Sequence, residues 1–187
     1  MEAKRNIDGI IYNTYRTDDE MADYLRQISE QIPIVYMNKI LGEEEKYSYV
    51  YTVQGLTDCG LPLEEKWVYR VQKENEPDYV NLGRDAARYY ASLTERPDAI
   101  LTATDMIGIG CVKGFNSRGI QVPKEISVIG FDNIFVGALI DPPLTTISQP
   151  VRKMGQTAAE ILISHITKKP VQNRVIFDGK LIVRETT

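Results

Sequence analysis

The stretch from Pro97 to Asn133 constrains the fold more than any other part of the chain. It contains two short apolar runs, at 97–105 and 126–132, and each run ends in polar residues that include an aspartate. Between them, residues 106–118 have the pattern of a helix, and Gly119 stands where that helix would end. An apolar run followed by a helix and a second apolar run is typical of a βαβ unit, in which the two strands are parallel.

The same pattern occurs near the N-terminus, where apolar runs at 7–13 and 33–38 flank a helix predicted to begin at Thr17. Further helices are predicted at 79–93, with Asn81 as a possible cap, and at 154–166. The runs 175–177 and 181–183 flank Asp178-Gly179, which is a hairpin signature. Strands that alternate with helices predict an α/β protein with parallel sheets flanked by helices.

The composition excludes several classes of protein. Of the 187 residues, 43% are hydrophobic and 26% are charged, which is ordinary for a globular protein. The net charge of -4 argues against a chain that binds nucleic acid by itself, because phosphate neutralisation needs a basic surface. Cys59 and Cys111 are far apart in the sequence, so no disulfide framework or zinc site is expected, and a reducing cytoplasm fits. No signal peptide is recognised, and no apolar run approaches the ~20 residues that a membrane span needs.

The glycines at 108, 110 and 114 resemble a dinucleotide-binding loop only superficially. The third glycine is one residue too late for that motif, and all three lie inside the predicted helix instead of in the turn before it. We therefore expect them to allow close packing of this helix against a neighbour, and we expect no cofactor.

Two acidic positions are candidates for chemistry. Thr104 and Asp105 stand where a strand becomes a helix, so either side chain could cap the first helical turn. Asp132 ends an apolar strand and is followed by a poor helix start. A carboxylate at that place can accept hydrogen bonds from two hydroxyls of a sugar, although it can also serve as a turn residue.

Catalysis has little support in the sequence. There is no nucleophile elbow, no zinc-protease motif and no phosphate-binding loop. The single histidine, His165, lies in an apolar stretch of a predicted helix, where an ordinary helical position is expected. No catalytic residue and no metal ligand is therefore predicted, and the chain is not expected to be an enzyme.

The order of several short motifs resembles one family. PDAI is followed by the Thr-Asp pair, then by GIQVPKEISVIGFD, by PPLTT with a glutamine three residues later, and by a helix that begins near Met154-Gly155. This order is similar to the effector-binding core of lactose/galactose-repressor-type transcription regulators. The N-terminal stretches KRNIDGIIYNTYRTDDE and IPIVYMNK resemble the first lobe of the same core.

The resemblance implies a two-lobe, periplasmic-binding-protein-like fold. In that family two α/β lobes enclose a sugar or a similar small metabolite, and a preceding helix-turn-helix headpiece binds operator DNA as a dimer. Binding of the effector changes the lobe arrangement and thereby the DNA affinity. The lobes are expected at 1–53 with 148–168, and at 54–147 with 169–187.

The resemblance also implies roles for individual residues. Asp132 matches the hydroxyl-binding acid of the family, Thr104 matches a position at which relatives often carry asparagine, and Gln149 lies at the lobe crossover. The full set of expected ligand contacts is Asp132, Thr104, Gln149, Tyr79 and Asp105. The expected dimer surface comprises Met106, Ile107 and Ile109 of one helix together with Leu139 and Ile140 of a loop.

This sequence also departs from the family pattern. The headpiece and the first strand and helix of the first lobe have no counterpart here, and a further segment with a ligand-binding arginine is missing between Val53 and Gln54. The first lobe is therefore expected to be incomplete, with two strands, an impaired effector site and exposed apolar surface.

These features favour the effector-binding and dimerisation core of a cytoplasmic transcription regulator. The partners expected are a small-molecule effector, a second copy of the chain, and operator DNA only through a headpiece outside this chain. A ribose-type solute-binding protein has the same architecture and is the main alternative. An α/β enzyme is a second alternative, for which no nucleophile and base were found.

Overall fold

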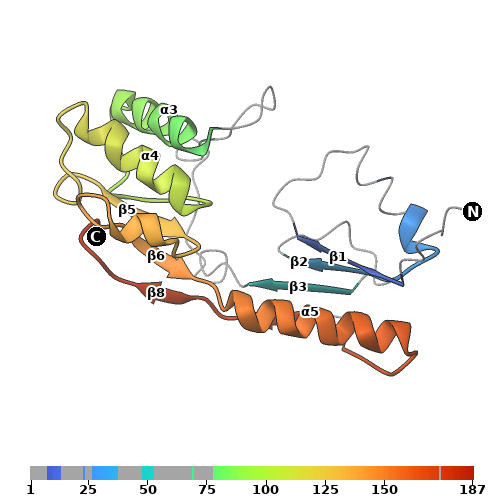
Figure 1. Ribbon diagram of the computed structural model, residues 1–187. Helices are drawn as coiled ribbons and strands as arrows, with labels where there is room; N and C mark the ends of the chain where they lie inside the picture. The colour runs from blue at the N-terminus through green and yellow to red at the C-terminus, as the bar shows by residue number, and fades with distance from the viewer. Residues whose placement is uncertain are drawn as a thin grey trace, which may run out of the picture. The chain divides into compact units, whose positions relative to one another are not determined.

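The computed structural model describes residues 8–13, 23, 27–37, 48–52, 69, 78–172 and 174–187. The chain forms two compact units (Figure 1). The first comprises Met1–Val53 and Pro150–Asp178, and the second Gln54–Gln149 and Gly179–Thr187. The chain thus passes from one unit to the other after residues 53, 149 and 178. The predicted lobes placed the last two of these crossings after residues 147 and 168.

The first unit contains a parallel sheet of four described strands. These are β1 (Ile10–Asn13), β2 (Ile34–Met37), β3 (Ser48–Thr52) and β7 (Arg174–Phe177), in the order β1-β2-β3-β7. The parallel pairing of the two N-terminal strands is confirmed, since Ile10 lies opposite Ile34. The expectation of a two-stranded sheet is wrong, because the tyrosine-rich segment β3 pairs with β2 and then with β7 from the distant end of the chain.

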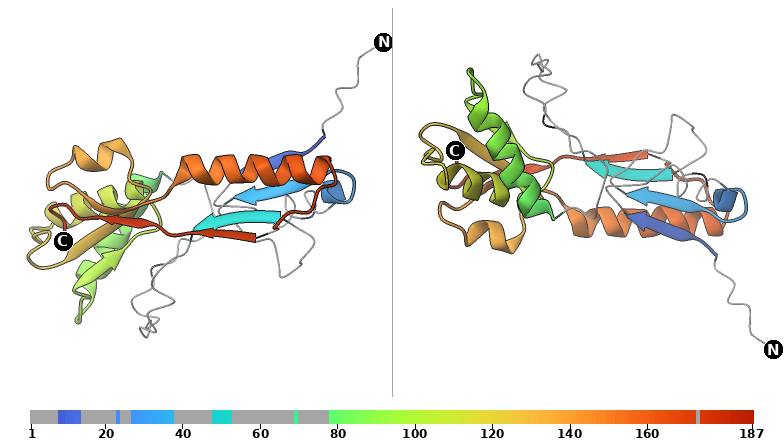
Figure 2. Two further views of the ribbon diagram at one scale, coloured as in Figure 1. Left: turned by 90° about the horizontal axis from the view of Figure 1, so that it is seen from below. Right: turned by 90° about the horizontal axis from the view of Figure 1, so that it is seen from above.

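Helix α5 (Val151–Ile166) covers one face of this sheet, and Figure 2 shows it running along the strands. Met154, Ala158 and Ile161 recur at helical spacing, and they pack with Val35 and Phe177 into the buried core of the unit. The helix begins three residues before its predicted start. The helix predicted to begin at Thr17 lies largely outside the described residues, as do Thr17 and Glu20.

The second unit contains a mixed sheet. Its described strands are β4 (Ala99–Leu101), β5 (Ser127–Phe131), β6 (Thr145–Ser148) and β8 (Lys180–Ile182), in the order β4-β5-β6-β8. The first three are parallel, and β8 is antiparallel to β6. The predicted hairpin around Asp178-Gly179 is wrong, because β7 and β8 belong to different sheets and the chain crosses between units at that dipeptide.

Two helices of this unit pack closely together. They are α3 (Tyr79–Ser92) and α4 (Asp105–Asn116), and the predicted role of the glycines as packing residues is confirmed at their contact. A Cβ atom placed on Gly110 would lie 2.1 Å from the backbone oxygen of Val80, and one on Gly83 would lie 2.1 Å from that of Ile107. The cap of α3 is Asp78 and not Asn81, because the Asp78 carboxylate accepts hydrogen bonds from the first-turn amides.

The core of the second unit lies beneath α4. Phe115, Val112, Val128 and Leu144 are fully or almost fully buried there, together with Cys111. Burial raises the pKa of the Cys111 thiol to about 12, so the thiol stays neutral at physiological pH. This agrees with an ordinary core cysteine, whereas Cys59 lies outside the described residues. Within the described part of the chain, no helix is long and apolar enough to cross a membrane.

Candidate functional site

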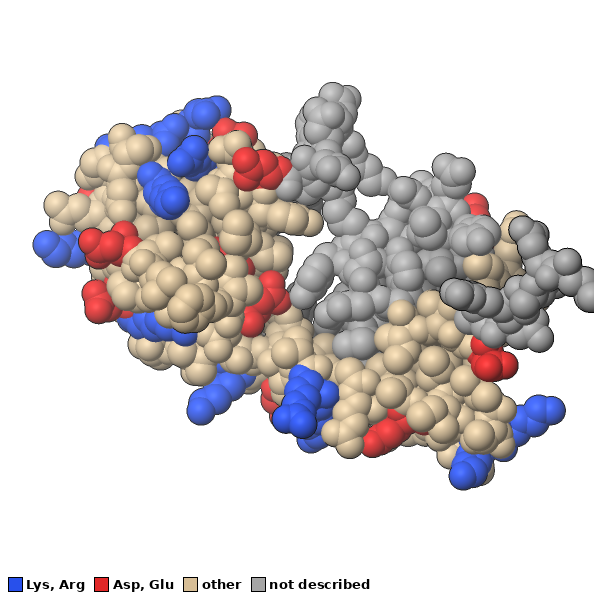
Figure 3. All heavy atoms as spheres, in the orientation of Figure 1, with Lys and Arg blue, Asp and Glu red and all other residues tan. Residues whose placement is uncertain are grey.

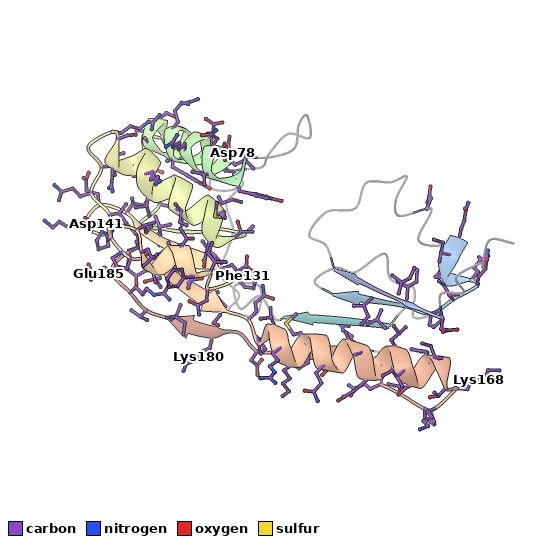
Figure 4. The ribbon with its side chains drawn as sticks, viewed as in Figure 1. Asp78, Phe131, Asp141, Lys168, Lys180 and Glu185 are labelled. Carbon is purple, nitrogen blue, oxygen red and sulfur yellow. The ribbon has the colours of Figure 1, made fainter. Side chains whose placement is uncertain are left out.

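The candidate site lies where the polar loops follow the strands of the second unit. Strand β5 ends at Phe131, which Figure 4 labels, and the next two residues leave the sheet with positive φ angles, 114° for Asp132 and 55° for Asn133. Residues other than glycine rarely adopt this left-handed region, and when they do the surrounding structure must hold them. The backbone conformation of Asp132 is therefore set by its contacts.

The structure brings together two of the predicted ligand residues. Gln149 directly follows β6 and is almost fully buried, and its side-chain Nε2 donates a hydrogen bond of 2.5 Å to Oδ1 of Asp132. The amide of Asp132 donates to the carbonyl of Ile147 at 2.9 Å. These contacts fix both the backbone and one carboxylate oxygen of Asp132, which is the preorganisation that a binding acid needs.

The sequence left open whether Thr104 or Asp105 caps the helix that follows, and the structure gives the two residues different roles. Thr104 is the N-cap of α4, and its Oγ1 accepts a hydrogen bond from the amide of Ile107 at 3.3 Å. Asp105 is the first helical residue and is completely buried, with 0% exposure. Its carboxylate accepts hydrogen bonds from Thr146 Oγ1 at 2.5 Å and from the amide of Ile134 at 2.7 Å. Asp105 therefore faces the loop after β5 instead of capping its own helix.

Tyr79 lies apart from these loops in the sequence. It is the first residue of α3, next to the capping Asp78, and its side chain is exposed. An exposed aromatic ring at a helix start is compatible with stacking on a sugar face, so the predicted role of Tyr79 stays a prediction.

Several polar residues around Asp132 were missed by the sequence analysis. Asn133 donates from its amide to Thr146 Oγ1 at 3.2 Å and from Nδ2 to Ser148 Oγ at 3.3 Å. Its Oδ1 accepts a hydrogen bond from Nη2 of Arg184 at 2.7 Å. The two threonines of PPLTT stand inside a quoted motif and Asn133 directly follows another, so these residues could have been singled out. Arg184 had no such signal, because it lies 51 residues from its partner.

The predicted dimer residues differ strongly in exposure. Ile109 is only 3% exposed and belongs to the core beneath α4, and Ile107 and Ile140 are partly buried against that core. Met106 and Leu139 are exposed, as are Phe135 and Val136 of the short helix η2 (Phe135–Ala138). We call the exposed apolar residues on and near η2 and at the start of α4 the η2 patch: Met106, Phe135, Val136 and Leu139.

The face of the second unit that Figure 3 shows carries charges of both signs. Figure 3 shows lysines and arginines interspersed with aspartates and glutamates on the visible face of this unit.

Comparison with known proteins adds a family and a set of relatives. Residues 48–187 match the profile of the periplasmic binding protein-like domain. The transcriptional repressor PurR of Photobacterium profundum is 27% identical over all of this chain and 66% of its own length. PurR of Vibrio vulnificus is 33% identical over 78% of this chain and 43% of its own length. The chain thus spans less than two thirds of the length of these curated relatives.

The alignment with the Photobacterium repressor extends over 226 positions, although this chain has 187 residues. The relative therefore has residues within the matched region that have no counterpart here.

Two solved structures of transcription regulators have a similar fold. A complex of the transcriptional regulator CelR with cellobiose matches 98% of this chain and 67% of its own, with 23% identity and a TM-score of 0.78. The transcription regulator CcpA of Lactococcus lactis matches 97% of this chain and 78% of its own, with 19% identity and a TM-score of 0.79. These matches confirm the predicted two-lobe, periplasmic-binding-protein-like architecture.

Proposed function

Because the chain belongs to the periplasmic binding protein-like domain family, we propose that it is the effector-binding and dimerisation core of a cytoplasmic transcription regulator. A sugar or a similar metabolite binds at the polar ends of the strands and favours one of two conformations with different DNA affinity. The DNA-binding headpiece lies outside this chain. The relatives named above are repressors and regulators, which favours this reading over a solute-binding protein of a transport system.

The observation that carries the proposal is the geometry of Asp132. Its carboxylate follows a strand, is held at one oxygen by Gln149, and lies on a loop whose amides at Asp132, Asn133 and Ile134 are hydrogen-bonded within the unit. A carboxylate fixed in this way recognises a pair of vicinal hydroxyls through charge-assisted hydrogen bonds. Thr104 and Tyr79 supply a second polar contact and a stacking surface in the proposal. Asp105 is assigned a supporting role, because both of its oxygens are already bonded inside the protein.

Effector binding is tested with the purified chain and four hydroxyl-rich probes: D-ribose, D-glucose, cellobiose and adenosine. We expect at least one probe to bind, as measured by isothermal titration calorimetry. Each hydrogen bond to a charged group contributes about 1.5–3 kcal/mol, so Asp132→Ala should weaken binding at least about 100-fold through the loss of two such bonds. The matched control is Glu160→Ala on α5, an exposed acid in the other unit, which should bind as the wild type does.

Failure of all four probes, tested to millimolar concentration, would contradict the hydroxyl-binding proposal. Equal affinity of wild type and Asp132→Ala for a probe that binds would place the site elsewhere. Turnover of a probe by the isolated chain would favour an enzyme instead.

Dimerisation is tested at the η2 patch. Phe135 is 77% exposed and Leu139 is 66% exposed, which is unusual for large apolar side chains on one short segment. We expect the wild type to sediment as a dimer and Leu139→Asp as a monomer, with a dissociation constant raised about 100-fold or more, because the variant places an unpaired carboxylate in an apolar contact. The control is Ile163→Asp on α5, which is similarly exposed but lies in the other unit. A dimeric Leu139→Asp, or a monomeric Ile163→Asp, would show that the η2 patch is not the interface.

A further inference from the structure

The C-terminal segment Arg184–Thr187 is built into the sheet of the second unit. Thr186 is completely buried between β5 and β6. Its hydroxyl accepts a hydrogen bond from the amide of Thr145 at 2.8 Å and donates one to the carbonyl of Val128 at 2.7 Å. The amide of Val128 in turn donates to the carbonyl of Thr186 at 2.9 Å. The segment is therefore a fixed part of the unit and a firm base for the side chain of Arg184.

Arg184 reaches from this base to the loop that carries Asp132. Its Nη1 donates a hydrogen bond of 2.6 Å to the carbonyl of Leu144, and its Nη2 donates one of 2.7 Å to Oδ1 of Asn133. The guanidinium is rigid and planar, so these two bonds fix its position. Asn133 is thereby held at its side-chain oxygen, while Thr146 and Ser148 hold its two nitrogens.

Asn133 is in contact with protein groups at its amide and at both ends of its side chain, and it adopts the left-handed conformation next to Asp132. Because these polar groups of Asn133 are hydrogen-bonded inside the protein, we expect Asn133 to affect a ligand through the adjacent Asp132. If Asn133 relaxed, the positive φ of the adjacent Asp132 would lose one of its supports, and only the Ile147 carbonyl and Gln149 would be left to hold it.

We propose that Arg184 is a positioning residue of the effector site, which sets the conformation of Asp132 through Asn133. This inference rests on the proposed function for its consequence on binding, but its structural part can be tested without any effector. With this role for Arg184, the C-terminal segment, which is remote from Asp132 in the sequence, contributes to effector affinity.

The structural part is tested by amide hydrogen exchange, followed by NMR, in wild type and Arg184→Met. The amide of Asn133 is expected to exchange at least about tenfold faster in the variant, since its bond to Thr146 Oγ1 depends on the loop conformation. The amide of Val128, which reports on the inserted segment through Thr186, is expected to keep its wild-type rate. Unchanged exchange at Asn133 would overturn the inference, and equal acceleration at Val128 would show that Arg184 merely anchors the segment.

The consequence for binding is measured with D-ribose, D-glucose, cellobiose and adenosine. For each probe that binds the wild type, Arg184→Met is expected to lower affinity about tenfold, and Arg184→Lys, which keeps the charge but not the fork, to lower it less. Arg118→Met is the matched control, because Arg118 also donates to a backbone carbonyl, that of Gly114, on α4 at 2.8 Å. The affinity of the double variant Arg184→Met/Asn133→Ala should be no lower than that of the single variant that binds more weakly. The two substitutions remove the same contact, so their effects should not add.

The outcomes separate this inference from the proposed function. If Asp132→Ala abolishes binding of a probe while Arg184→Met binds it as the wild type does, only the role of Arg184 is rejected. If no probe binds the wild type, the proposed function in its hydroxyl-binding form is rejected, and the exchange rates still decide whether Arg184 holds the loop.

Discussion

The Gly110→Ala variant is expected to be less stable than the wild type by about 3 kcal/mol, which corresponds to a melting temperature lower by about 6–12 °C. The added methyl group would lie 2.1 Å from the backbone oxygen of Val80 and 2.8 Å from Cα of Gly83. These are backbone atoms of α3, so no side chain can rotate away, and the two helices have to separate. The better helix propensity of alanine offsets only about 1 kcal/mol of this cost.

The control for this prediction is Gly155→Ala on α5. Gly155 lies inside a helix as Gly110 does, but a Cβ at this position meets no atom within 4 Å. The propensity gain is then unopposed, and the variant should be equal to the wild type or up to about 1 kcal/mol more stable. Urea unfolding followed by circular dichroism measures both variants. A Gly110→Ala protein as stable as Gly155→Ala would show that α3 and α4 are not in close contact at this position.

The helix glycines also show what sequence reasoning can achieve here. The spacing of Gly108, Gly110 and Gly114 excluded a dinucleotide loop and indicated close packing, because both arguments depend on local geometry. The alternation of apolar runs and helices predicted parallel strands for the same reason. Periodicity over ten to fifteen residues reports on one face of one element, and it does so without knowledge of the rest of the chain.

The errors concern pairings between distant segments. Asp178-Gly179 has the composition of a tight turn, yet β7 before it pairs with β3 and β8 after it pairs with β6. A turn signature describes the backbone at two residues, whereas the sheet to which each strand belongs is decided by burial elsewhere. The two-stranded first lobe was wrong for the same reason, because the segment Ser48–Thr52 is recognised as a strand only when its neighbours are known.

The site was predictable to a similar extent. The resemblance pointed to Asp132 and Gln149, and the structure places their side chains in hydrogen-bond contact. Thr146 and Arg184, which hold the adjacent Asn133, were not predicted, because each contact joins positions 13 or more residues apart and depends on the loop after β5 turning back over the sheet. Supporting contacts of this kind carry no spacing pattern, so a single sequence does not reveal them.

The Asp105→Ala variant is expected to lose about 3 kcal/mol of stability. The carboxylate is completely buried and accepts hydrogen bonds from Thr146 Oγ1 and from the amide of Ile134. Its removal leaves the partly buried Ile134 amide without an acceptor, which costs about 1–3 kcal/mol, and it removes an acid from the first turn of α4, where negative charge is favourable by up to about 1 kcal/mol. Asp105→Asn keeps the shape and one acceptor oxygen, so it should lose about 1 kcal/mol or less. Urea unfolding of the two variants measures the difference.

The same pair of variants decides between the two roles considered for Asp105. If Asp105 touched the effector through its charge, Asp105→Asn would lose affinity for a bound probe nearly as much as Asp105→Ala, whatever their stabilities. If it only supports the loop at Ile134, affinity should follow stability: Asp105→Asn should bind within a few-fold of the wild type, and Asp105→Ala more weakly, because the loop that carries Asp132 is no longer held at Ile134. A stable Asp105→Asn protein that fails to bind would therefore return Asp105 to the effector contact that the sequence resemblance first suggested.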